Sequence, residues 1–256
     1  MTFTVNFNFI DRLNTIKNSI FYSICYHENE IVGFYREHYN SKIIKMIKLN
    51  KNFNIIQDNV DTFFGEDPRI FILHHTLYII NNDFNNIHLI NVYAKKIIKI
   101  NLEGKNFTFM LYNNNVYVMH YIKPFILYKL DVESGELINI DVENSENKDC
   151  QYRGGTSGYK YDDNCIYGFG HKTYTKNEVL IHDIFLWIID FSNEKPKISI
   201  FDIDQPSNSK NIIDPTSIIN INNKFYLITA ETDYPWYPLF DGQDYITNIY
   251  EFIIKK

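Results

Sequence analysis

The sequence predicts an all-β protein, a five-bladed β-propeller in which four-stranded antiparallel blades surround a central channel. Helical periodicity is almost absent, and apolar residues alternate with polar ones or form short runs rich in Ile, Val, Tyr and Phe. One strand–turn–strand pattern also occurs five times along the chain. A β-sandwich would explain the strand composition but not five copies of one hairpin, so the propeller accounts better for both observations.

Each copy of the repeated hairpin has a first strand, a polar turn and a second strand that starts with an apolar residue, usually followed by Tyr. The polar turns lie at residues 27–30, 74–76, 113–115, 162–164 and 222–224. The second strands start at Ile31, Leu77, Val116, Ile166 and Phe225. Their spacings of 46, 39, 50 and 59 residues leave room for two further strands after each hairpin, which gives the four strands of a blade.

The predicted blades follow one another in a single domain of 256 residues, because no linker, low-complexity tract or charge block interrupts the chain. The expected blade limits are residues 18–60, 66–102, 105–145, 151–205 and 212–256. The N-terminal strand, residues 2–9, is expected to pair with the last blade and close the ring.

Composition excludes several classes of function. The formal net charge is −6 and the basic residues are scattered, which is unlike a protein that binds nucleic acid or anionic lipid. Mean hydropathy is −0.28, and no apolar run approaches the length of a membrane span. The N-terminus lacks the pattern of a signal peptide, so a cytoplasmic location is expected. Cys25, Cys150 and Cys165 lie far apart and are expected to be reduced, buried thiols.

The candidate site lies at one end of the predicted channel. The starts of the first strands and the ends of the second strands should meet there, and both sets of positions are polar. Residues before the first strands include Asn18, Glu66, Asp67, Arg69, Lys105, Asn106, Gln151, Arg153 and Asp214. Residues after the second strands include Arg36, Asn82, Asp83, His120, His171, Glu231 and Asp233. This mixture of acids, bases and imidazoles suits an anionic or polyhydroxylated ligand.

Two further candidates for sugar contacts come from segments beside these strand ends. His182 is expected in a turn that precedes the strand at residues 184–189. Trp236 lies in the aromatic loop at residues 234–238, and aromatic faces stack on sugar rings. A turn histidine and a loop that packs on its own blade are the structural alternatives.

A family resemblance rests on the segment Glu66-Asp67-Pro68-Arg69-Ile70. It resembles the Asp-Pro-Arg motif of the inverting β-mannoside phosphorylases, which belong with β-1,2-mannosyltransferases to a superfamily of five-bladed, glycosidase-like propellers. The resemblance continues through the other predicted blades, from about Asn18 to Asp233. The matching positions are Arg36, Lys105-Asn106, Arg153-Gly154-Gly155 with His171, and the segment 228–233.

The resemblance implies a mechanism of inverting glycosyl transfer. Asp67 would be the single general acid or base, and phosphate would be held by Arg36, Arg153 and His171, with Arg69 nearby. Lys105, Asn106 and Asp233 would be further substrate-binding residues. Arg153 stands where the family has Lys, and the chain is shorter than the phosphorylases, so phosphate dependence and mannose preference are open at this point.

Elementary chemistry agrees with this division of roles. A phosphate nucleophile needs cations and hydrogen-bond donors, whereas a hydrolase needs a second carboxylate to activate water. Asp214 and Asp233 are the candidates for such a carboxylate. No metal motif or cofactor motif is present, so the expected ligand is a carbohydrate, with inorganic phosphate or a sugar phosphate as a substrate.

Three functions therefore remain open. The first is a glycosyltransferase or glycoside phosphorylase for β-mannoside-like substrates. The second is a propeller that binds a sugar or a protein without catalysis, since propellers host many functions. The third is a glycoside hydrolase.

Overall fold

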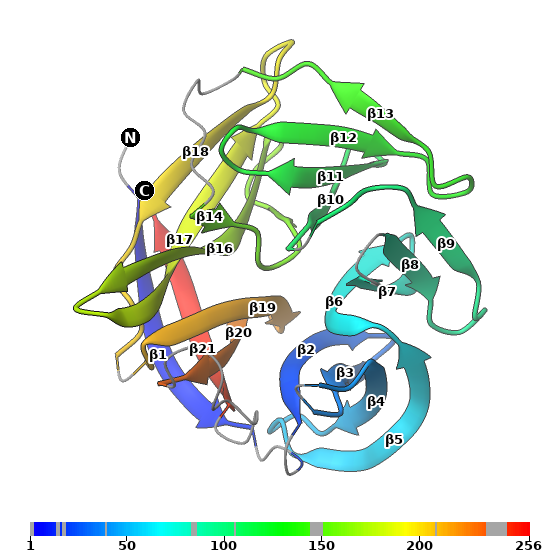
Figure 1. Ribbon diagram of the computed structural model, residues 1–256, viewed down its shortest axis with the longest axis vertical. Helices are drawn as coiled ribbons and strands as arrows, with labels where there is room; N and C mark the ends of the chain where they lie inside the picture. Colours follow the sequence, from blue (N-terminus) through cyan, green and yellow to red (C-terminus); the bar gives the residue numbers. More distant parts are fainter. Residues whose placement is uncertain are drawn as a thin grey trace.

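The strands of the protein form five blades around one axis, which makes the fold a five-bladed β-propeller (Figure 1). The computed structural model describes residues 3–13, 16, 19–38, 40–82, 86–104, 106–143, 151–207, 209–233 and 245–256. These residues form 21 strands joined by turns and irregular segments. None of the described segments is a helix long and apolar enough to span a membrane.

The first three blades are separate antiparallel sheets of four strands each, paired in sequence order. Blade one contains β2 (Ile20–His27), β3 (Glu30–Arg36), β4 (Ile43–Leu49) and β5 (Ile55–Phe64). Blade two contains β6 (Glu66–Leu73), β7 (Thr76–Asn82), β8 (Ile87–Asn91) and β9 (Ile97–Ile100). Blade three contains β10 (Thr108–Tyr112), β11 (Asn115–Tyr121), β12 (Ile126–Leu130) and β13 (Leu137–Ile140).

The fourth blade has an inner strand that is split in two. Its strands are β14 (Tyr152–Arg153), β15 (Tyr159–Lys160), β16 (Cys165–Lys176), β17 (Val179–Asp190) and β18 (Lys197–Asp202). Both β14 and β15 pair with β16. Between them, the Thr156 N–H donates to the Phe169 carbonyl and the Gly158 N–H donates to the Phe109 carbonyl of blade three. A parallel bridge from His182 to Ile212 joins this blade to the fifth.

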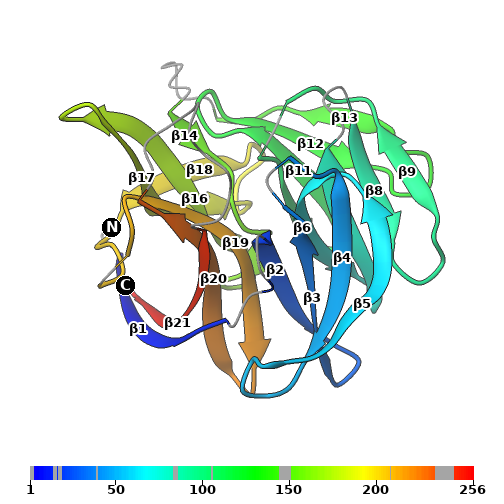
Figure 2. The ribbon, with the colours of Figure 1, turned by 60° about the horizontal axis from the view of Figure 1, so that its bottom comes forward.

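The fifth blade combines both ends of the described chain. It contains β19 (Ile212–Ile221), β20 (Lys224–Thr232), β21 (Ile246–Lys255) and, on its outer side, β1 (Thr4–Arg12). Figure 2 shows β1 in blue beside β21 in red. Their antiparallel register runs from Thr4 opposite Lys255 to Arg12 opposite Asn248. The N-terminal strand therefore closes the ring, as the sequence predicts.

Four of the repeated hairpins turn through two residues in the left-handed region, with φ between 45° and 67°. Type I′ turns require positive φ at both central positions, and Asn tolerates this conformation better than most residues. The central pairs are Glu28-Asn29, His74-His75, Asn113-Asn114 and Asn222-Asn223. The fourth hairpin has a longer turn, residues 161–164, in which Asp162 Oδ1 accepts hydrogen bonds from the backbone N–H groups of Asn164 and Cys165.

The apolar core lies between neighbouring blades, where five clusters of buried side chains fill the spaces. Trp187 is fully buried in the cluster between blades three and four. Gly168 lies opposite it on β16, and a Cβ there would come within 2.2 Å of Trp187 Cζ2. The indole ring therefore requires glycine at this position.

One element differs from the sequence prediction. His182 is expected in a turn, but it lies inside β17, opposite Thr173 of β16. The hairpin of β16 and β17 reverses at Asn177-Glu178, both with positive φ, so the polar residues at 171–183 form a continuous two-stranded ribbon. Backbone pairing across this long ribbon outweighs the polar composition that indicates a turn.

Candidate active site

Hydroxyl groups join the inner strands of different blades along the channel. Ser23 Oγ donates a hydrogen bond to the carbonyl of Pro68 at 2.6 Å, and Ser157 Oγ donates to the carbonyl of Ile70 at 2.6 Å. We call the end where β6 and β19 begin, near Asp67 and Asp214, the site mouth. The opposite end, beside the Asn113-Asn114 turn, is the turn mouth.

Asp67 lies at the site mouth, at the start of β6. Its φ is +47°, and the register of β6 against β7 shifts between Glu66 and Arg69. The carboxylate lies 3.1 Å from Nη1 of Arg36, which extends from the end of β3 in blade one. The side chain of Asp67 remains 26% exposed, whereas that of Arg36 is 8% exposed. Asp67 is therefore a positioned carboxylate that a ligand can reach.

Arg36 itself is held by its surroundings. Its Nε donates a hydrogen bond to the Ser41 carbonyl at 2.7 Å, and its Nη2 lies 3.7 Å from Glu66 Oε1. These contacts fix the guanidinium with one edge toward Asp67. The predicted association of these two residues across blades one and two is thus present.

Arg69 extends across the channel instead of toward solvent. Its Nη1 donates hydrogen bonds to the carbonyls of Gly155 and Pro215, and its Nη2 donates to Asn106 Oδ1 at 3.1 Å. Burial lowers the pKa of Arg69, while Asp67 and Asp214 oppose that shift. Arg69 of blade two therefore connects blades three, four and five at the site mouth, and its donors are used within the protein.

A cavity of about 560 Å³ lies between blades three and four and contains three predicted site residues: Asn106, His120 and Arg153. Tyr121, Lys123 and Tyr152 also line it, and Lys123 Nζ lies 4.2 Å from the centroid of the Tyr152 ring. We call this cavity the cationic pocket. An aromatic ring beside the exposed Arg153 and the half-buried Lys123 suits a sugar that carries a negative charge.

His120 is the neutral member of the cationic pocket. Its Nε2 donates a hydrogen bond to the Glu103 carbonyl at 2.9 Å, and its ring stacks on Phe107 with centroids 5.0 Å apart. Burial lowers the pKa of His120, more than the hydrogen bond to Glu103 raises it. The imidazole is therefore uncharged at neutral pH and offers Nδ1 as an acceptor.

His171 and His182 face Asp214 at the seam of blades four and five. His182 Nδ1 lies 2.8 Å and His171 Nδ1 lies 3.6 Å from Asp214 Oδ1. His171 is 4% exposed, and burial lowers its pKa to about 3; Asp214 opposes this shift, whereas His182, Arg69 and Arg153 add to it. His171 is thus a neutral imidazole at pH 7, directed at a carboxylate.

The remaining acidic residues at this end have protein partners. Asp233 forms an ion pair with Lys210 at 2.5 Å and accepts a hydrogen bond from the backbone of Asn211. Glu231 is fully buried, and its Oε1 accepts hydrogen bonds from Thr229 and Tyr250. Four predicted site residues lie outside the described residues: Asn18, Asp83, Lys105 and Trp236.

Sequence reasoning missed the side chains that complete the cationic pocket: Tyr121, Lys123 and Tyr152. Tyr121 and Lys123 follow His120 closely, and Tyr152 precedes Arg153. Their nearness to predicted residues was the available signal, but only the packing of blade three against blade four brings both segments to one cavity.

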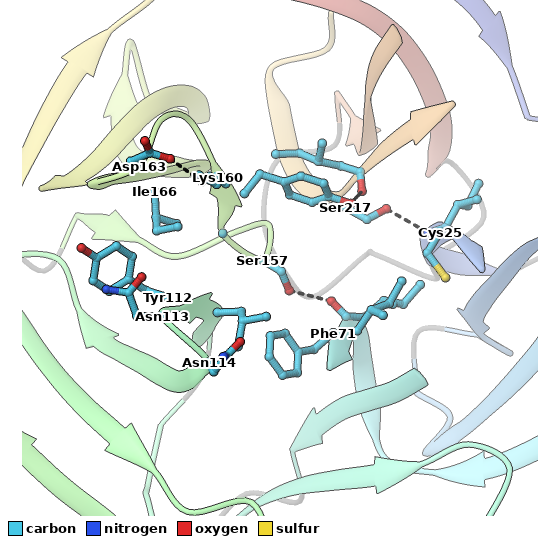
Figure 3. A pocket seen from close by; sticks show the side chains of 17 residues that line it. Cys25, Phe71, Tyr112, Asn113, Asn114, Ser157, Lys160, Asp163, Ile166 and Ser217 are labelled. Atoms are coloured by element: carbon cyan, nitrogen blue, oxygen red, sulfur yellow. Dashed lines mark hydrogen bonds and ion pairs between the residues drawn. The ribbon is translucent and has the colours of Figure 1, made fainter. Parts of the chain in front are cut away.

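Another cavity, of about 600 Å³, opens at the turn mouth (Figure 3). Its rim includes Asn113, Asn114 and the ion pair of Lys160 with Asp163, and Ser157 and Ser217 lie deeper. It contains none of the predicted site residues. Volume alone therefore does not select the site, and the chemistry lies at the site mouth.

Comparisons with known proteins agree with the fold. No match was found among protein-family models or among curated protein sequences. A mannose phosphorylase from Leishmania mexicana, MPT-4 in complex with phosphate ion, is similar in structure, with TM-score 0.62, 8% identity and coverage of 95% of this chain and 88% of that chain. An alpha-L-arabinofuranosidase from Podospora anserina, in complex with cellotriose, is similar with TM-score 0.63, 7% identity and coverage of 98% and 97%.

A hypothetical protein from Leishmania major is also similar, with TM-score 0.62, 9% identity and coverage of 95% of this chain and 90% of that chain. At these identities the comparisons establish a shared five-bladed, glycosidase-like propeller fold.

Proposed function

We propose that this protein is a carbohydrate-active enzyme that transfers a glycosyl group with inversion. It would act as a glycosyltransferase or glycoside phosphorylase on β-mannoside-like substrates, with Asp67 as the general acid or base. The observation that carries the proposal is the Asp67 carboxylate, held by Arg36 and open to a ligand at the site mouth. The similarity to a mannose phosphorylase supports the same class of substrate.

Asp67 would transfer the proton in both directions of the reaction. In phosphorolysis, phosphate oxygen bonds to the anomeric carbon as the glycosidic C–O bond breaks, and protonated Asp67 delivers its proton to the leaving oxygen. In synthesis, a sugar 1-phosphate loses phosphate, and the Asp67 carboxylate accepts the proton of the attacking hydroxyl. The contact of 3.1 Å with Arg36 Nη1 holds the Asp67 carboxylate in one position for either direction.

The cationic pocket would take the phosphate group. Arg153 is exposed there, Lys123 lies beside Tyr152, and Asn106 joins the pocket to Arg69. Guanidinium and ammonium groups bind phosphate by charge-assisted hydrogen bonds without any general base. Inversion would then need this pocket to present phosphate to a sugar bound beside Asp67, which does not itself line the pocket.

Transfer to phosphate is favoured over hydrolysis by the state of the other carboxylates. Three acidic residues close to this end already accept hydrogen bonds from protein groups: Asp214, Glu231 and Asp233. An inverting hydrolase needs a second carboxylate free to activate water, about 6.5–9.5 Å from the acid. Asp214 and Glu231 are buried, which keeps both away from solvent water, and Asp233 is held by Lys210.

A donor screen tests the proposal. The full chain is incubated with mannose 1-phosphate, GDP-mannose, or β-mannobiose plus phosphate, and products are identified by mass spectrometry. Asp67→Asn should lower turnover by about 10²–10⁴-fold, the usual contribution of a general acid or base. Asp163→Asn, at the exposed turn mouth, is the matched control and should behave as the native protein.

Each other outcome identifies a different function. Mannose release without phosphate would indicate a hydrolase. Sugar binding that persists in Asp67→Asn, with no turnover of any donor by the native chain, would indicate a non-catalytic binding propeller. Equal turnover by Asp67→Asn and by the Asp163→Asn control would show that Asp67 takes no part in the reaction.

A further inference from the structure

A compact group of nitrogen and oxygen atoms lies where blade four meets blade five. His171 of β16, His182 of β17 and Asp214 of β19 each offer one ligand atom, and these atoms lie within 4.8 Å of one another. The two imidazole rings stack with centroids 4.9 Å apart and an angle of 21° between their planes. Two strands of one blade and one strand of the next therefore converge on a single point.

His171 has an unused nitrogen within this group. The side chain is only 5% exposed, and its buried Nδ1 has no hydrogen-bond partner among the described residues. A buried polar atom without a partner costs about 1–3 kcal/mol, so a ligand, ion or water that binds this nitrogen would recover that free energy. The nitrogen lies 3.6 Å from Asp214 Oδ1, too far for a hydrogen bond but close enough for both atoms to bind one ion.

The charge states of the group suit a cation. Burial lowers the pKa of His171 to about 3, so its imidazole is neutral at pH 7. Burial raises the pKa of Asp214, but His171, His182 and Arg69 lower it by more, so this residue is a carboxylate. A metal ion would take the place of the proton in the hydrogen bond between His182 Nδ1 and Asp214 Oδ1.

We propose that His171, His182 and Asp214 bind one divalent transition-metal ion of the zinc class. Zinc bonds of about 2.0–2.1 Å at tetrahedral angles place ligand atoms about 3.4 Å apart. The observed separations from Asp214 Oδ1, 2.8 and 3.6 Å, lie on either side of that value. Two imidazoles and one carboxylate favour zinc over Ca²⁺ and Mg²⁺, which prefer oxygen ligands, and leave a fourth position for water.

Two arginines near the proposed metal site oppose the binding of a cation. Arg69 and Arg153 both act electrostatically on His171, and Arg69 also acts on Asp214. Their repulsion of a dication makes the Asp214 carboxylate indispensable. The ion would join β16 and β17 to β19, beside the backbone bridge from His182 to Ile212, so binding should stabilise the seam between the blades. This proposal is independent of glycosyl transfer.

Metal titration of the full chain tests the site. Protein treated with EDTA and dialysed is titrated with ZnCl₂ at pH 7 in a calorimeter, and its Tm is measured with and without zinc. We expect one ion per chain and a higher Tm with zinc. Co²⁺ in place of zinc should give the visible absorption bands of a tetrahedral complex.

Two variants and two controls locate the ion. His171→Ala and His182→Gln should each lower zinc affinity at least tenfold and abolish the Co²⁺ bands. His182 is partly exposed, so its replacement keeps the test valid if His171→Ala fails to fold. His75→Ala, in an exposed turn, and His120→Ala, in the cationic pocket, should bind as the native chain. Absence of zinc binding, or binding that survives both ligand variants, would overturn the proposal.

Discussion

Arg69 should stabilise the propeller more than any ordinary surface residue, because one guanidinium connects four blades. It donates hydrogen bonds to two backbone carbonyls and to the side chain of Asn106. Arg69→Met keeps most of the length of the side chain but removes every donor. The carbonyls of Gly155 and Pro215 and the amide oxygen of Asn106 would then lose their partner.

The expected magnitude follows from those three acceptors. A hydrogen bond from a charged donor contributes about 1.5–3 kcal/mol, and each buried acceptor left without a partner costs about 1–3 kcal/mol. Desolvation of the guanidinium, which lowers its pKa, offsets part of the sum. We therefore expect a loss of about 3–5 kcal/mol, or about 6–20 °C in Tm at 2–4 °C per kcal/mol.

Urea unfolding followed by fluorescence and circular dichroism measures the effect. Arg12→Met is the matched control, because Arg12 is exposed and its side chain makes a long contact of 3.4 Å with Asn248; it should cost less than about 1 kcal/mol. Arg69→Lys keeps the charge without the planar fork and should fall between the two. A loss under about 1 kcal/mol for Arg69→Met would refute the idea that this residue joins the blades.

Three further predictions concern packing, pH and ligand binding. Gly168→Ala should cost about 1–3 kcal/mol in urea unfolding, because its Cβ would meet Trp187 at 2.2 Å; an unchanged midpoint would contradict this packing. Because the pKa of His171 is about 3 in the folded protein and near 6.5 when exposed, stability should fall as pH drops from 6.5 to 3, by up to about 1.4 kcal/mol per pH unit. His171→Leu should flatten this slope. A slope equal to that of the native protein would show that His171 is not its source. Arg153→Gln should raise KM for phosphate or sugar phosphate about tenfold or more while kcat changes less. An unchanged KM would show that Arg153 does not bind the phosphate group.

Local sequence signals were sufficient to predict the strands and turns of the blades. Residue alternation with period two predicts strands, and turn pairs such as Asn113-Asn114 adopt the left-handed conformation that tight hairpins need. The repetition of this unit predicted the number of blades, and the N-terminal strand was correctly expected to close the ring. The polar stretch around His182 was wrongly predicted to be a turn, because its polarity reflects the ribbon of β16 and β17.

The candidate site was predicted less completely. The sequence selected Asp67 and Arg36 by their motif and by their place at strand ends, and the fold brings them to 3.1 Å from each other. It assigned Arg69 to ligand binding, whereas the guanidinium uses its donors on Gly155, Pro215 and Asn106. Strand order predicts which ends share a mouth, but not which side chain crosses the channel.

The sequence by itself determined the strands, the turns and the polar end of the channel, because these depend on residues close together in the chain. Only the tertiary structure decided which distant residues touch. Arg69 and Gly155 are 86 positions apart, and His182 and Asp214 are 32 positions apart. Their contacts arise from the packing of one blade against the next, which is set by the volume and shape of the apolar side chains between the sheets.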